Sequence, residues 1–161
     1  MKHILSIAVV GAVLFLYAPA VDAKGSPDKI IVTRGGLVRP VEITERETLQ
    51  GFDPWMGRFI DWSKGPVGSP IAGSSDQAQI YEVFFYMKWK GRHSRFDRGN
   101  LKLIYSFRYC PGRVGEAGLI YLPGKDDKYH VNSGTIWREG DDGKWHQASA
   151  AWDALMKRAL T

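Results

Sequence analysis

The sequence predicts an α+β domain in which a mainly antiparallel sheet of about five to seven strands carries short helices and a C-terminal helix packed on it. Three observations support this fold class. Two successive runs in the centre of the chain alternate apolar and polar residues with a period of two. Turn-forming pairs separate further short β-branched runs, and the last dozen residues carry apolar side chains at helical spacing. A β-sandwich or a partly closed barrel with attached helices is the structural alternative.

Residues 1–23 have the pattern of a secretory signal peptide. A charged start precedes an apolar run over 4–17, and small residues follow, with Ala20 and Ala23 as alternative residues before the cleavage point. The apolar run is shorter than the roughly 20 residues that a permanent membrane-spanning helix needs. We therefore predict that residues 24–161 form a single globular domain, secreted or periplasmic, with no transmembrane segment after removal of the signal.

The predicted domain must be stabilised by packing. It has 138 residues (161 minus 23), which corresponds to one domain and is long enough to bury about two-thirds of its unfolded surface. Cys110 is the single cysteine, so no disulfide can form within the chain. The favoured interpretation of Cys110 is a buried or merely tolerated thiol, and an intermolecular disulfide is the alternative.

The first elements are predicted to be two strands over 30–44. Two short β-branched runs lie on either side of Gly35 and Gly36, which indicates a strand, a turn and a strand. Pro40 removes a backbone donor and therefore places the second strand at an edge of the sheet.

A short helix is predicted over about 45–50. Thr44 is followed three residues later by Glu47, which is the pattern of a capping box. Gly51 lies where such a helix would end.

The stretch FDPWMGRFIDW, residues 52–62, is predicted to form a second helix over 54–62. Asp53 is a suitable N-cap, and Pro54 suits the first helical position. Gly57 weakens this helix by up to about 1 kcal/mol relative to alanine. At about 100° per residue, six apolar residues fall in one arc: Phe52, Trp55, Met56, Phe59, Ile60 and Trp62. Such stripes usually pack, so we interpret these rings as core, with a ligand platform as the alternative.

The central part of the chain predicts a long loop followed by a β-hairpin. Residues 63–76 are dense in Gly, Pro and Ser and show no periodicity. In the next run the odd positions over 81–89 are all apolar, and in LKLIYSFRYC the odd positions over 101–109 repeat that pattern. Two alternating runs joined by a polar loop indicate an antiparallel hairpin with one buried face.

Two more strands, a turn and a helix are predicted towards the C-terminus. Strands are expected in GLIYLPG (118–124) and YHVNSGTIW (129–137), and the pair Asp142-Gly143 forms a tight turn before Trp145. The last element is a helix over 149–160 that packs on the sheet. It is indicated by one cap, three apolar residues at helical spacing and two cations near the negative end of the dipole: Ser149, Trp152, Leu155, Met156, Lys157 and Arg158.

The positive charge of the chain is concentrated in the connection of the predicted hairpin, residues 88–102, which we call the basic tip. It holds six Lys or Arg and one Asp, a net charge of +5 that equals the charge of the whole chain. Such a patch attracts polymers that carry phosphate or carboxylate groups, and salt weakens the attraction. The predicted ligand-binding residues are Arg92, His93, Arg95 and Arg98. A solvated tip whose cations prevent pairing with another chain is the alternative.

No catalytic, cofactor or metal motif stands out in the sequence. The histidines that remain after removal of the signal form no close pair, and neither His130 nor His146 has a recognisable spacing to Cys110. The acidic turns KDDK and GDDG lack the alternating oxygen ligands of a calcium loop. A GxSxG elbow, a HExxH helix and a phosphate loop are all absent from the sequence. We therefore predict no cofactor, no metal site and no catalytic residue.

Several strings of the sequence resemble small exported bacterial proteins that carry no assigned activity. These strings are GGLVRPVEIT, FDPWMGRFIDW, YEVFFYMKW, GLIYLPG and GTIWREGDDGKWHQASAAWDAL. The resemblance covers nearly the whole mature chain and implies a self-contained extracytoplasmic domain. Because that group has no assigned function, the resemblance implies none.

The sequence favours a non-catalytic extracytoplasmic binding or interaction module that uses the basic tip. Export favours an anionic glycan, a wall polymer, a lipid headgroup or an acidic protein as partner over nucleic acid. One alternative is a small secreted hydrolase that acts on cell-envelope material through Cys110 or through a His and carboxylate pair. Another is an accessory or inhibitory protein that docks on a partner through exposed aromatics.

Overall fold

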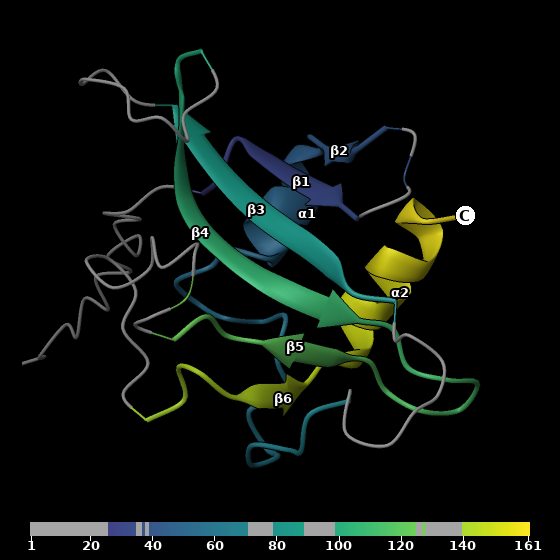
Figure 1. Ribbon diagram of the computed structural model, residues 1–161. Helices are drawn as coiled ribbons and strands as arrows, with labels where there is room; N and C mark the ends of the chain where they lie inside the picture. The colour runs from purple at the N-terminus through teal and green to yellow at the C-terminus, as the bar shows by residue number, and fades with distance from the viewer. Residues whose placement is uncertain are drawn as a thin grey trace, which may run out of the picture.

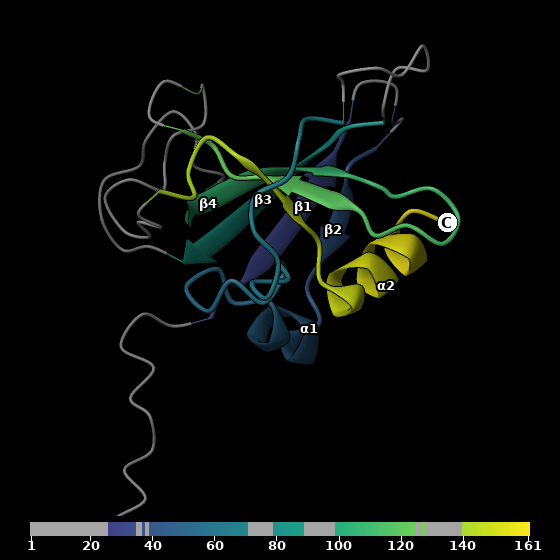
Figure 2. The ribbon, with the colours of Figure 1, turned by 90° about the horizontal axis from the view of Figure 1, so that it is seen from below.

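The computed structural model describes residues 26–34, 37, 39–70, 79–88, 99–124, 127 and 140–161. These residues form a six-stranded antiparallel sheet with two helices on one face, which confirms the predicted α+β fold class (Figures 1 and 2). The elements are β1 (Lys29–Thr33), β2 (Val41–Ile43), α1 (Arg46–Gly51), β3 (Tyr81–Lys88), β4 (Leu101–Cys110), β5 (Leu119–Tyr121), β6 (Trp145–Gln147) and α2 (Ala150–Ala159). The predicted signal peptide and the predicted strand over 129–137 lie outside the described residues.

The strands are ordered β2-β1-β3-β4-β5-β6 in the sheet. The two alternating runs form the long central pair β3 and β4, as their pattern predicts. β2 is an edge strand, in agreement with the position of Pro40 immediately before it. The β6 edge is bordered by an irregular segment, in which Asp61 N–H donates to Gln147 O at 2.9 Å and Val67 N–H donates to Trp145 O at 2.8 Å. These bonds satisfy part of the β6 edge, which limits its ability to pair with another chain.

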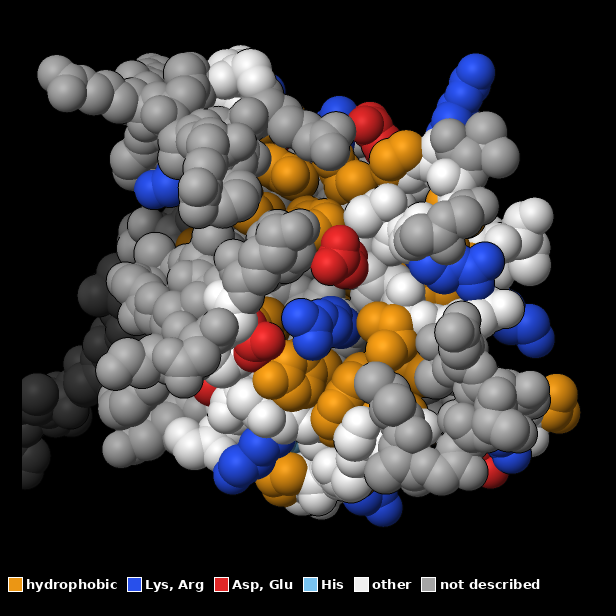
Figure 3. Space-filling model, in the orientation of Figure 1, with side chains coloured by type: hydrophobic (Ala, Val, Ile, Leu, Met, Phe, Trp, Pro, Cys, Tyr) orange, Lys and Arg blue, Asp and Glu red, His pale blue; other side chains and the backbone are white. Residues whose placement is uncertain are grey.

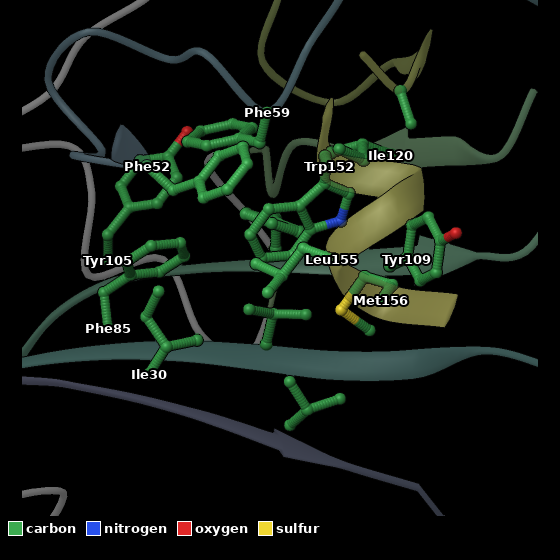
Figure 4. Close-up of a cluster of buried hydrophobic side chains, with 14 of the residues drawn as sticks. Ile30, Phe52, Phe59, Phe85, Tyr105, Tyr109, Ile120, Trp152, Leu155 and Met156 are labelled. Atoms are coloured by element: carbon green, nitrogen blue, oxygen red, sulfur yellow. The ribbon is translucent and has the colours of Figure 1, made fainter. Parts of the chain in front are cut away.

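An aromatic core joins the central strands to the helices (Figure 4). Trp152 of α2 is fully buried, and its ring centroid lies 5.1 Å from that of Phe52 and 5.2 Å from that of Phe107. Phe59 is also fully buried, with its ring centroid 4.6 Å from that of Phe107. The sheet, α2 and the segment after α1 therefore pack against one another through the same few aromatic rings.

The predicted helix over 54–62 is wrong, because these residues form consecutive turns. Asp53 does act as a cap, since its Oδ1 accepts the Trp55 N–H at 2.7 Å. Gly57 has a φ of 61°, and a residue in this left-handed conformation ends a right-handed helix. The chain then turns back, with Ile60 N–H donating to Gly57 O at 3.1 Å.

The turn at Gly57 also decides which side chains of this stretch are buried. Phe52, Phe59 and Ile60 belong to the core, so the core interpretation is confirmed for them. It is wrong for Met56, which is 60% exposed, and for Trp62, which is 41% exposed. The helical arc that grouped all six residues does not form, because the chain turns back at Gly57.

The predicted capping box at the start of α1 is also wrong. The N-cap is Glu45, one residue after Thr44, and no side chain caps the helix. The reason lies in β2, because Ile43 still pairs with Ile30 of β1 and the backbone stays extended through Glu45. The helix itself forms one residue later than the pattern suggests, and Leu49 faces the core.

A β-bulge in β4 changes the face of its first residues. Phe85 pairs with Tyr105 but Tyr86 pairs with Leu103, so Ile104 is an extra residue on β4. An extra residue shifts the alternation by one, so the side chains of β4 before Ile104 lie on the opposite face from the one that the alternation predicts. Leu101 and Leu103 were expected beside Tyr105 in the core, and both instead belong to the cluster on the other face.

The sheet is apolar on both faces, in contrast to the single buried face that the sequence predicts. On the face away from the helices, four residues form a buried cluster: Ile31, Phe84, Tyr86 and Leu103. Figure 3 shows this face, with hydrophobic side chains over the middle of the sheet and acidic and basic side chains among them. The alternation missed the second face because Phe84 and Tyr86 occupy even positions, the set whose outer members, Glu82 and Lys88, are charged.

The C-terminal helix has the features that the sequence predicts. The Ser149 hydroxyl accepts the Trp152 N–H at 3.2 Å, and Leu155 and Met156 are buried with Trp152 against the sheet. The predicted turn before β6 also forms, with Gly143 at a φ of 79°. Among the described residues, no helix has the length and apolar character needed to cross a membrane.

Candidate functional site

The four predicted ligand-binding residues, Arg92, His93, Arg95 and Arg98, lie outside the described residues, as does all of 89–98. The described residues on either side show how the basic tip is attached. β3 and β4 stay paired up to Lys88 and Leu101, so the connection leaves and re-enters the sheet at one end. Lys88, Gly99 and Asn100 are all exposed at that end.

The attachment of the basic tip is fixed by Asp28, just before β1. Its Oδ2 accepts the backbone N–H of Lys88 at 2.7 Å, and its Oδ1 lies 3.7 Å from Lys88 Nζ. The Lys88 side chain is nevertheless 71% exposed, so its charge contributes to the field at this end of the sheet. An exposed pair of this kind adds little stability, and its main effect is to orient the strand end.

In its thiol form, the hydrolase alternative requires Cys110 to lie close to an imidazole, and Cys110 and His146 do not lie close in this way. Cys110 pairs with Leu119 in the ladder, whereas His146 pairs with Ile120, one position further along β5. Successive residues of a strand point to opposite faces, so Cys110 and His146 lie on opposite faces of the sheet. His130 lies outside the described residues.

Cys110 is a buried thiol, as the favoured interpretation of the sequence expects. Burial raises the pKa of this thiol, which keeps it protonated and poorly nucleophilic near neutral pH. Its Sγ lies 3.8 Å from the carbonyl oxygen of Pro111. Within the described parts of the chain, no three His, Cys, Asp or Glu side chains are grouped as metal ligands.

A cavity of about 490 Å³ opens beside α2, and we call it the α2 pocket. Three parts of the chain contribute to it: the paired ends of β3 and β4, the loop 111–117, and the last turns of α2. Figures 1 and 2 show that these three segments lie near one another. Five aromatic or aliphatic side chains line it: Tyr81, Tyr109, Val114, Met156 and Leu160. Four charged side chains also line it: Arg113, Glu116, Asp153 and Lys157.

The loop that borders the α2 pocket has a fixed shape. A Cβ at Gly112 would lie 2.3 Å from the carbonyl oxygen of Glu116, so only glycine fits there. Gly115 has a φ of 83°, and Glu116 N–H donates to Arg113 O at 2.9 Å. The loop therefore closes on itself, and its backbone has this shape without contact from a ligand.

Asp153 joins the three parts of the pocket. Its Oδ1 accepts the Tyr109 hydroxyl and its Oδ2 accepts the Gly118 N–H, both at 2.9 Å. Gly118 O in turn accepts the Ala148 N–H at 2.8 Å. Both carboxylate oxygens of Asp153 are therefore already used within the protein, and the carboxylate acts as a structural anchor.

We predict an alkaline loss of stability from Tyr109. Burial, followed by the hydrogen bond to the Asp153 carboxylate, raises the pKa of Tyr109 well above its usual value of 10.0. Because the folded-state pKa exceeds the unfolded one, this contribution is fully present below about pH 10 and is lost as the pH rises above it. Between pH 9 and 11, the fall in unfolding free energy should be about 1 kcal/mol smaller in Tyr109→Phe than in the natural chain.

Urea unfolding at several pH values checks this prediction. The burial and the Asp127 contact of Tyr121 raise its pKa as well, and this contribution cancels because it is the same in both proteins. Parallel curves for the two proteins above pH 9 would show that the pKa of Tyr109 is not raised in the folded protein.

A cluster of polar and aromatic side chains lies on the face of the sheet away from the helices, and its members contact one another. Arg108 Cζ lies 5.3 Å from the ring centroid of Tyr121, and its guanidinium is 3.6 Å from Asp127. The Tyr121 hydroxyl donates to Asp127 at 2.9 Å, and the Trp145 ring centroid lies 5.3 Å from that of Tyr121. Because the charges and hydrogen-bonding groups of these residues pair with one another, we interpret the cluster as a structural contact that links β4, β5 and β6.

The docking alternative predicts exposed aromatics, and Trp62 is the main one among the described residues. Its indole N–H donates to Gly57 O at 2.9 Å, and its ring centroid lies 5.7 Å from that of His146. The side chain is thus held in place while 41% of it remains exposed. Met56 and Val67, in the same segment, are also exposed large hydrophobics.

In comparisons with protein-family models, curated proteins and solved structures, no match to this chain was found. The resemblance to small exported bacterial proteins therefore stays a prediction from the sequence. Sequence reasoning missed the α2 pocket, because Tyr109 and Asp153 are 44 positions apart and their patterns indicate only a strand and a helix. The one signal was a cluster of three glycines over 112–118, which is typical of a tightly shaped loop.

Proposed function

We propose that this protein is a non-catalytic binding module of an extracytoplasmic compartment and that its basic tip binds anionic envelope polymers. Residues 1–23, with the pattern of a signal peptide, support the location. The proposed ligand is a wall or capsule polymer with repeated carboxylate or phosphate groups. Repeated charges suit a cluster of cations better than a single small anion, because several weak contacts act together.

The observation that carries this proposal is the attachment of the basic tip. Its described residues Lys88, Gly99 and Asn100 are exposed and lie at one end of the central strand pair. In the sequence, Arg92, Arg95 and Arg98 lie between these two paired and exposed strand ends. Exposed attachment points of this kind support a contact with a long polymer.

The proposal predicts that charge reversal in the tip abolishes retention on a polyanion. The triple variant Arg92→Glu, Arg95→Glu, Arg98→Glu changes the net charge of residues 88–102 from +5 to −1. At low salt, its affinity for immobilised polygalacturonate should fall by at least about tenfold, because the attraction changes to repulsion. The natural chain should be retained and should elute when salt is added. Circular dichroism checks that both proteins are folded.

A matched control separates the basic tip from net charge alone. Arg46, Arg58 and Arg158 are exposed residues outside the tip, and their reversal to Glu changes the net charge of the chain by the same amount. This control should keep most of the retention. Equal loss in both variants, or full retention of the tip variant, would overturn the proposal. Binding to phosphatidylglycerol vesicles but not to polygalacturonate or polyphosphate would instead assign the tip to lipid headgroups.

A further inference from the structure

We propose that the α2 pocket is a second binding site, specific for a small amphiphile with an apolar body and an acidic head group. Its volume of about 490 Å³ lies within the roughly 300–1,000 Å³ range of small-molecule sites. The site uses none of the residues of the basic tip. Tyr81 and Tyr109 lie at the end of the β3–β4 pair opposite to Lys88, about 23 Å away at the usual rise per strand residue.

The apolar body of the ligand is indicated by the lining of the pocket. Tyr81 and Tyr109 face each other across the strand pair, with ring centroids 6.4 Å apart. Met156 and Leu160 contribute from α2. Contact with these side chains would remove apolar surface from water, at about 25 cal/mol for each Å².

The acidic head group is indicated by the charges that remain unpaired. The pocket is lined by two cations and two carboxylates. The Asp153 carboxylate keeps its charge, but both of its oxygens already accept hydrogen bonds within the protein. Among the described residues, the side chains of Arg113, Lys157 and Glu116 are not engaged in this way. None of these three has an ion pair within the described part of the chain. Two cations from separate elements would both gain from one carboxylate or phosphate between them.

Two further features favour an anion in this pocket. Arg34 does not line the pocket, but its Cζ lies 5.2 Å from the ring centroid of Tyr81, so a further cation lies close to the aromatic wall. The loop that carries Arg113 has its shape fixed by Gly112 and Gly115, so little ordering is needed when a ligand binds. The pocket therefore combines an apolar wall with a preformed cationic border.

Titration calorimetry with four eight-carbon probes tests this proposal. Octanoate and octyl phosphate carry the proposed head groups, octanol carries none, and octylamine carries the opposite charge. The two anions should bind at least about tenfold more tightly than octanol, and octylamine should bind most weakly. A preference between octanoate and octyl phosphate would show whether the natural ligand resembles a fatty acid or a phosphorylated lipid.

Variants of pocket residues and of a residue outside the pocket show whether the probes bind in the α2 pocket or are attracted by the charge of the whole protein. The double variant Arg113→Gln, Lys157→Gln should lose the preference for anions over octanol, whereas Arg158→Gln should keep it because Arg158 lines a different groove. Leu160→Trp should weaken the binding of all four probes, because the larger side chain narrows the cavity. Equal affinity for octanoate and octanol, no binding of any probe, or equal effects of the 113/157 and 158 variants would overturn the proposal. The tip variant Arg92→Glu, Arg95→Glu, Arg98→Glu should bind octanoate normally.

Discussion

Replacing Trp152 with alanine is expected to lower the free energy of unfolding by about 3–5 kcal/mol, the largest effect that we predict for a single side chain. Trp152 is fully buried and contacts the rings of Phe52, Phe59, Phe85, Phe107 and Tyr109. Its removal would leave a cavity between α2 and the central strands that these rings cannot fill. Urea unfolding followed by circular dichroism measures the loss.

Trp62 provides the matched control for this prediction. It is the same residue type, but 41% of it is exposed and its N–H bonds within its own turn. Trp62→Ala should cost about 1 kcal/mol, mainly from the lost hydrogen bond and partial burial. Similar losses for Trp152→Ala and Trp62→Ala would mean that α2 is not held to the sheet by Trp152.

The second large effect is expected at Gly118, where alanine should cost about 3 kcal/mol. A Cβ at this position would lie 2.6 Å from both Asp153 Oδ1 and Tyr109 Cε2, and 3.0 Å from the carbonyl oxygen of Cys110. These atoms belong to the anchor of α2, so a shift of any of them strains the hydrogen bonds of Asp153. Unfolding in urea again provides the measurement.

Gly65→Ala is the control, because nothing lies within 4 Å of a Cβ at Gly65. Its stability should stay unchanged or rise slightly, since alanine restricts the unfolded chain. If Gly118→Ala were as stable as Gly65→Ala, the close approach of Tyr109 and Asp153 at Gly118 would be incorrect.

The elements that the sequence predicted well depend on local patterns. The alternation over 81–88 fixes the strand β3, and Ser149 with the apolar spacing after it fixes α2. In both cases the local preference and the tertiary contacts agree. Pro40 likewise indicated an edge strand because the loss of a backbone donor acts in the same way in any sheet.

The elements that the sequence predicted poorly depend on the backbone conformation at one residue. The left-handed conformation of Gly57 ended a helix that its neighbours favoured. The extra residue Ile104 moved Leu101 and Leu103 to the other face of the sheet, and nothing in an alternating run marks where a bulge occurs. Residues on both sides of such a point keep their local pattern while their surroundings change.

The two proposed sites differ in how far the sequence indicates them. The basic tip is a continuous run, so its charge is visible in the sequence. The α2 pocket is assembled from three separated segments, and its charged lining becomes meaningful only once Asp153 is known to be paired with Tyr109 and Gly118. A site of that kind can be inferred only from tertiary contacts.

The proposed binding through the basic tip is tested most directly by an NMR titration of the ¹⁵N-labelled protein with polygalacturonate. At low salt, the largest shift changes should fall on the amides of residues 88–102, and the amides of 109–118 beside the α2 pocket should change little. Added salt should reverse the changes, because the attraction is between exposed charges. Changes centred on the α2 pocket or on the face of the sheet away from the helices, or no changes at low salt, would contradict the proposal.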